Sequence, residues 1–223
     1  HAVVALHLPA SDPIHKATII PRGRALGMVM RLPEGDRVSL AYDKILADLR
    51  VACGGRIAED LIFGADKITT GASSDIRMAT DMARRMVTEW GMSDKLGFLA
   101  YAGDEQEVFL GRSVTQSKTV SESTADLIDL EVRRIVDEAY KDAENLLKKH
   151  NDQLENLAQG LLEYETLNGE EIKIIVDGGT LSRNEGSDDE PTEPRAKKPR
   201  SGLPSGGRRS AKPSGEPAGP DGA

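Results

Sequence analysis

Apolar residues recur at helical spacing over much of residues 1–176. The longest such pattern begins after Ser121, where apolar side chains follow one another mainly three or four positions apart. A second helical pattern restarts at Asn151, and a short third one follows Asn168, whose side chain is suited to cap a helix. This succession predicts a mainly helical fold with a helical hairpin near its C-terminal end. The longest stripe consists of Ile128, Val132, Ile135, Val136, Ala139, Tyr140, Ala143, Leu146 and Leu147.

The stretch 69–91 reads as a tight turn followed by one amphipathic helix. Either Ser73 or Ser74 is predicted to be its N-cap, because a hydroxyl can accept a hydrogen bond from a free amide of the first turn. Asp75 then falls in that first turn, where the helix dipole favours a carboxylate. Gly91 is expected to end the helix. The predicted apolar stripe consists of Ile76, Ala79, Ala83, Met86, Val87 and Trp90.

The first part of the chain predicts a small β element among helices. Residues 1–8 look like a helix end, and the β-branched run 15–21 and the stretch 27–33 look like short strands. Their short connection favours an antiparallel pair. A further helix is predicted from a cap at Ser39 to about Cys53.

Two adjacent glycines follow this predicted helix. Gly54 and Gly55 permit either a break or a close approach of another backbone segment. Residues 56–63 are expected to form a separate helix that Gly64 ends. The sequence does not decide between the two roles of the glycine pair.

Composition divides the chain. Residues 179–223 are rich in Gly, Pro and Ser and are predicted to be a disordered tail, because they cannot bury enough apolar surface to fold. Residues 1–120 and 121–178 are predicted to be a core and a helical C-terminal part of one domain. The tail could serve as a tether, an adaptor site or a dispensable solvated end.

Charge and cysteine content exclude some classes of function. The net charge is −8, and residues 1–181 carry the excess of acidic side chains, so binding to nucleic acid is not expected. The one cysteine, Cys53, precludes an intrachain disulfide and is predicted to be a buried structural thiol. No stretch is apolar over the roughly 18–20 residues that a membrane-spanning helix needs.

Local spacing alone supports no class of enzyme. No two of the four histidines, His1, His7, His15 and His150, lie four positions apart, so the chain holds no complete His-Glu-x-x-His motif. His7 and His15 are interpreted as exposed residues at loop edges, and His150 as a helix-end residue placed to favour a partial positive charge. By the same criteria Asp75 is either a helix-start carboxylate or a metal ligand.

Five stretches, in this order along the chain, resemble the peptidase domain of the FtsH family, which comprises membrane-anchored, ATP-dependent zinc metalloproteases. The resemblance extends from residue 1 to about residue 178. Each stretch is short, and their combination is specific. They are Ile19–Gly27, Gly54–Asp60, Thr70–Asp75, Val108–Arg112 and Tyr164–Leu167.

The resemblance implies a zinc site. His1, followed by Ala-Val-Val-Ala-Leu, aligns with the second histidine of the family's His-Glu-Ala-Gly-His motif, and Asp75 aligns with the family's third ligand. Two imidazoles and a carboxylate leave a fourth zinc position open for water. The family's first ligand and its catalytic glutamate would precede His1, so the chain is expected to be a fragment without a catalytic residue and to be inactive by itself. A processed chain is the other interpretation.

The resemblance also implies properties of a longer protein. ATP and Mg²⁺ would be bound only by an upstream ATPase module, and the expected assembly is a homo-oligomer, a hexamer. Its substrates would be unfolded, membrane and cytoplasmic proteins, degraded at the inner (plasma) membrane by a peptidase domain that faces the cytoplasm. Strand residues 27–32 either pair with substrate along an edge or are structural. A non-catalytic helical module for interaction or assembly is the alternative function.

Overall fold

The computed structural model describes residues 1–181, apart from 22, 24–25, 34, 36–38 and 102–119. The predicted tail from residue 182 onward and the stretch Val108–Arg112 lie outside these ranges. The described part is mainly helical with a small antiparallel sheet, which confirms the predicted fold class. Residues His1–Ser182 pack as one compact unit, and the predicted boundary at residue 120 stays a prediction.

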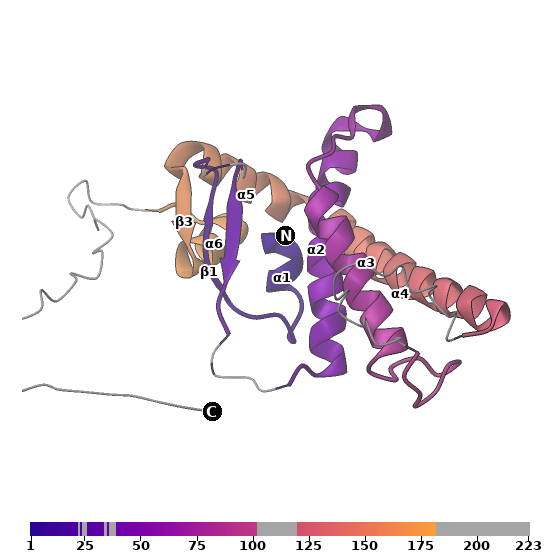
Figure 1. Ribbon diagram of the computed structural model, residues 1–223. Coiled ribbons are helices and arrows are strands. Elements are labelled where there is room, and N and C mark those ends of the chain that lie inside the picture. The colour runs from indigo at the N-terminus through magenta and orange to yellow at the C-terminus, as the bar shows by residue number, and fades with distance from the viewer. Residues whose placement is uncertain (22, 24–25, 34, 36–38, 102–119, 182–223) are drawn as a thin grey trace, which may run out of the picture. The chain divides into compact units, whose positions relative to one another are not determined.

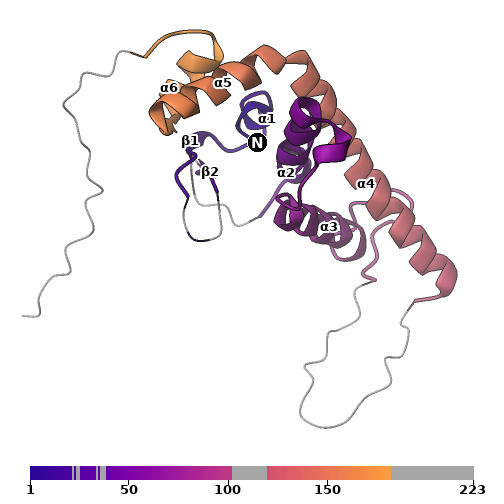
Figure 2. The same cartoon turned by 90° about the horizontal axis from the view of Figure 1, so that it is seen from above.

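The long helix α2 (Tyr42–Phe63) lies at the centre and packs against α3 (Ser73–Thr88) and α4 (Glu122–Lys149), as Figures 1 and 2 show. The apolar stripes of the three helices meet in one buried cluster. Each helix therefore buries the apolar face that the sequence periodicity gives it against the other two helices. The best-buried members of this cluster include Ile45, Leu49, Ala83, Met86, Val87 and Ile135.

The short helix α1 (Ala2–Leu6) lies between α2 and the sheet (Figure 1). Its residues Val3 and Val4 are almost fully buried. They belong to a second apolar cluster, which also contains residues of α2, α4, α5 (Asn151–Tyr164) and α6 (Gly169–Val176). Helix α1 is therefore an interior element, held on several sides.

The sheet has the strand order β2-β1-β3. Strand β1 (Ile14–Thr18) pairs antiparallel with β2 (Met28–Arg31), as predicted, and on its other side with β3 (Thr166–Asn168), which the sequence analysis did not predict. Strand β2 is thus an edge strand among the described residues. Strand β3 thereby joins the N-terminal strands to the C-terminal helices α5 and α6.

The separate helix predicted over residues 56–63 is wrong, and of the two roles left open for the glycine pair a break is excluded, because α2 runs without interruption through Gly54 and Gly55 to Phe63. Its start at Tyr42, with Ala41 as the N-cap residue, also replaces the predicted cap at Ser39. Each helical glycine costs about 1 kcal/mol relative to alanine. Burial of α2 in both apolar clusters offsets this cost and keeps the helix continuous. After α2 comes a short 3-10 turn, η1 (Ala65–Lys67).

Helix α3 differs from its prediction at both ends. Its N-cap residue is Ala72, and no serine side chain caps it. The hydroxyl of Ser73 instead donates to the carbonyl oxygen of Thr70. Ile76 is 52% exposed, because it lies on the outer face of the first turn. At its other end the helix stops at Thr88, before the predicted end at Gly91, which has a positive φ of 59°.

The predicted helical hairpin is a bend instead. Helix α4 is joined to α5 by the single residue His150, which is too short a link to reverse the chain. Helix α5 therefore leads away from α4 and packs against α6 (Figure 2). The predicted cap at Asn168 is confirmed, and it forms a capping box with Glu171.

The bend is supported by a pair of histidines, and this corrects the predicted exposure of His7. The rings of His7 and His150 stack with their centroids 3.7 Å apart, and Nε2 of His7 is hydrogen-bonded to Gln153 of α5. Burial, and then the neighbouring His7, lowers the pKa of His150. Position 150 therefore disfavours the positive charge that was expected there. His15 is exposed, as predicted.

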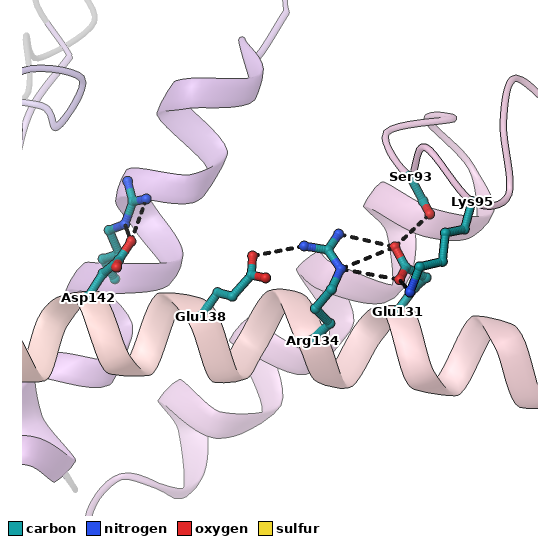
Figure 3. Close-up of polar contacts among 7 residues, drawn as sticks. Ser93, Lys95, Glu131, Arg134, Glu138 and Asp142 are labelled. Carbon is teal, nitrogen blue, oxygen red and sulfur yellow. Dashed lines mark hydrogen bonds and ion pairs between the residues drawn. The ribbon is translucent and has the colours of Figure 1, made fainter.

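A buried carboxylate ties the loop after α3 to α4 (Figure 3). The side chain of Glu131 is 1% exposed. It accepts hydrogen bonds from Ser93 at 2.9 Å and from Arg134 at 3.1 Å, and Lys95 lies 2.8 Å away.

Among the described residues, none of the helices is both long and apolar enough to span a membrane.

Candidate metal centre

His1 and Asp75 are 74 positions apart in the sequence and lie side by side in the structure. His1 precedes α1, and Asp75 is in the first turn of α3. Nε2 of His1 is 3.7 Å from Oδ2 of Asp75, and both side chains are about one-third exposed. The two residues that the family resemblance implicates therefore face each other at the surface of the domain.

The backbone of α2 fixes the orientation of the His1 ring. Nδ1 of His1 lies 2.8 Å from the carbonyl oxygen of Val51. A carbonyl oxygen only accepts, so Nδ1 carries the proton of this hydrogen bond. In the neutral ring Nε2 then has a free lone pair, directed toward Asp75. This arrangement is typical of a metal-binding histidine.

The glycine pair of α2 makes room for His1, and close approach is thus the role that the structure supports. A Cβ atom on Gly54 would lie 3.0 Å from the backbone nitrogen of His1, and one on Gly55 would lie 2.8 Å from Nε2. Any side chain at position 55 would collide with the ring nitrogen that faces Asp75. The two glycines therefore serve the position of His1 and not a helix end.

Polar contacts hold the turn before Asp75 on α2. Nη2 of Arg56 donates to the carbonyl oxygen of Thr69 at 2.9 Å. The Thr69 hydroxyl donates to Glu59 and accepts a hydrogen bond from the amide of Gly71. The sequence analysis missed the role of Arg56 and Glu59, although both belong to the stretch Gly54–Asp60. Their spacing of three on one helix was the signal that they share a face.

The His1–Asp75 pair lines a cavity of about 800 Å³ between α2, α3 and α5. Two ligands of one tetrahedral zinc ion, bound at 2.0–2.2 Å, are roughly 3.4 Å apart. The observed separation of 3.7 Å is too long for a hydrogen bond and close to that value. The pair therefore fits as part of a zinc site. No group of three or more candidate ligands occurs within the described residues.

The neighbouring thiol of Cys53 belongs to the apolar core. Cys53 is buried, as predicted. Burial, and then the nearby charge of Asp75, raises the pKa of its thiol to about 11. Cys53 is a packing residue of the apolar core, where it lies in the same cluster as Val51 and Ile57.

The sequence model of peptidase family M41 matches residues 1–175 of the chain. Three proteins named ATP-dependent zinc metalloprotease FtsH are similar to it. That of Caulobacter vibrioides is 56% identical over 83% of this chain and 30% of the relative. That of Rickettsia bellii is 54% identical over 83% and 29%, and that of Photobacterium profundum 49% identical over 79% and 25%. The chain thus spans less than a third of the length of these relatives, and the predicted resemblance is confirmed.

Proposed function

The chain belongs to peptidase family M41, and from this premise we propose that it is the peptidase part of an ATP-dependent zinc metalloendopeptidase. The observation that carries the proposal is the pairing of His1 with Asp75 across 74 positions. The family resemblance assigns these residues to two ligand positions of the motif, and their separation suits a shared metal ion. The hydrogen bond of Nδ1 with the Val51 carbonyl leaves Nε2 as the ring nitrogen that faces Asp75.

Each residue of the pair has a distinct part in the proposed chemistry. His1 supplies a neutral nitrogen whose direction is fixed by the Val51 carbonyl. Asp75 supplies a carboxylate at a helix N-terminus, where the helix dipole favours a negative charge. When bound, zinc lowers the pKa of a coordinated water toward neutrality, so that it can attack a peptide carbonyl. The edge strand β2 is a candidate surface for holding an extended substrate.

The general base of this reaction is proposed to lie outside the chain. In the family motif the first ligand and the glutamate precede the histidine that corresponds to His1. We therefore propose that the 223-residue chain does not hydrolyse peptides unaided. The rest of the proposed protein is an ATPase module that binds ATP and Mg²⁺, with a membrane anchor.

The proposed assembly is a hexamer at the inner membrane. Its peptidase domains would face the cytoplasm, and its role would be protein quality control through degradation of unfolded, membrane and cytoplasmic proteins. The names of the FtsH relatives support the ATP dependence and the zinc. The location, the subunit number and the substrates are proposals that follow from family membership.

Adding His-Glu-Ala-Gly in front of His1, so that the motif is complete, tests the function. Zinc content and hydrolysis of unfolded casein are measured for this extended chain and for its Asp75→Asn variant. The matched control is Asp81→Asn, an exposed aspartate of the same helix. We expect zinc to be lost with Asp75→Asn and kept with Asp81→Asn. Equal zinc in both variants would refute the site and favour the non-catalytic helical module.

A further inference from the structure

The two proposed ligands come from different elements, so the site requires a contact that fixes one element relative to the other. The position of His1 is fixed on α2 by its hydrogen bond with Val51 and by its close approach to the glycine pair. Asp75 follows the turn 69–72, which belongs to no helix or strand. The last residue of this turn, Ala72, is the N-cap residue of α3. The position of Asp75 therefore depends on how this turn is attached to α2.

The attachment is made at Thr69. Arg56 donates to its carbonyl oxygen, and Glu59 accepts from its hydroxyl. The same hydroxyl accepts from the amide of Gly71 at 3.2 Å, within the turn. Both polar groups at the start of the turn are thus bound to a single face of α2.

These contacts of Thr69 lie directly beside the proposed ligand His1. Arg56 directly follows Gly55, the residue against which Nε2 of His1 lies. Its side chain is 24% exposed, and its Nε is buried, with Oε2 of Glu59 3.9 Å away. One turn of α2 therefore contacts the His1 ring and also holds the turn 69–72 that precedes Asp75.

We propose that Arg56, acting through Thr69, is a positioning residue of the metal site. The inference rests on the proposed zinc function. Arg56 touches neither ligand. It holds the turn so that the Asp75 carboxylate meets Nε2 of His1 at a distance suited to one ion, and Glu59 holds the Thr69 hydroxyl in the same arrangement. Loss of a group hydrogen-bonded directly to a metal ligand typically lowers metal affinity 10–100-fold, and this sets the upper limit for a residue that acts through the turn.

The test is a titration of the full 223-residue chain with Zn²⁺ alone. The NMR signal of the His1 ring is the readout of this titration. The variants are Arg56→Met and Arg56→Lys, with Asp75→Asn as the reference for a lost ligand. Arg84→Met is the matched control, because Arg84 is a half-exposed arginine of α3 that pairs with Asp129. We expect the zinc midpoint to rise clearly more than twofold, and at most 10–100-fold, for both Arg56 variants and less than twofold for Arg84→Met.

A second pair of variants tests the other attachment of the turn, the contact of the Thr69 hydroxyl with Glu59, if an Arg56 variant does not fold. Thr69→Ser keeps the hydroxyl, and Thr69→Val removes it at nearly equal volume. We expect weaker zinc binding for Thr69→Val only, with faster amide hydrogen exchange over residues 69–76.

The outcomes separate this inference from the proposed function. Weaker binding by Asp75→Asn, with wild-type binding by the Arg56 and Thr69 variants, would overturn the positioning role alone. Unchanged binding by Asp75→Asn, or no response of His1 in the unaltered chain, would overturn the zinc site and with it the inference. Equal weakening by Arg84→Met would show a general effect of removing an arginine, and would also overturn it.

Discussion

Replacing Glu131 by glutamine should destabilise the domain far more than any exposed carboxylate would. The carboxylate is buried and accepts from Arg134 and Ser93, with Lys95 in ion-pair contact (Figure 3). Glutamine preserves the volume and one acceptor oxygen. It removes the negative charge that faces two cationic side chains, and this charge is the part of the interaction that the substitution measures.

The magnitude follows from the pKa of Glu131. Hydrogen bonds from Arg134, opposed by burial and reinforced by Lys95 and Ser93, lower this pKa from 4.5 to about 2. Each pKa unit corresponds to about 1.4 kcal/mol, so the ionised group stabilises the fold by about 3 kcal/mol at neutral pH. The unfolded chain takes up the proton first as the pH falls. The contribution is therefore complete above pH 4.5 and is lost as the pH falls through about 2.

Urea unfolding of wild type and Glu131→Gln at pH 7 and pH 3 measures this contribution. We expect a difference in the free energy of unfolding of about 3 kcal/mol at pH 7 and roughly half of that at pH 3. Glu138→Gln is the control: this carboxylate also pairs with Arg134 but is 62% exposed, so a change below about 1 kcal/mol is expected. A Glu131 effect below about 1 kcal/mol at pH 7, or an equal effect at both pH values, would refute the reasoning.

Two further predictions concern the metal site and the histidine pair. Gly55→Ala should displace the His1 ring, because its Cβ would lie 2.8 Å from Nε2. Zinc titration should show weaker binding while thermal unfolding changes little, since alanine favours the helix by about 1 kcal/mol; unaltered zinc affinity would contradict this. Burial lowers the pKa of His150, so the unfolded chain binds its proton more readily, and stability should fall as the pH drops below about 6.5. His150→Phe, which keeps an aromatic ring against His7, should reduce this loss between pH 7 and pH 5 in chemical unfolding, and parallel pH profiles would count against the proposed cause.

Periodicity predicted the helices well where burial falls on one face. The stripe from Ile128 to Leu147 became α4, and the cap at Asn168 was located from its residue type alone. The predictions that Ile76 belongs to the apolar stripe and that a serine caps α3 were wrong. An apolar stripe gives no information on where the partner helix ends. The three residues of β3 carry too little pattern to stand out, since a strand this short exists only through its pairing with β1.

The candidate site required information that spacing does not contain. His1 and Asp75 are joined by the fold, and only the family resemblance selected them beforehand. The glycine pair is a similar case, because local propensity favours a break and the contact with His1 explains continuity. Arg56 lay within a matched motif, but its partner is a backbone carbonyl, which leaves no trace in side-chain patterns.

The continuity of α2 has a consequence for how the domain opens. Ile45 and Leu49 belong to one apolar cluster, and Val51 and Ile57 to the other. Neither half of the domain can detach while this helix is intact, and the helix cannot fray inward without exposing both clusters. The central amides of α2 should therefore exchange with solvent only when the whole domain unfolds, as part of one cooperative unit.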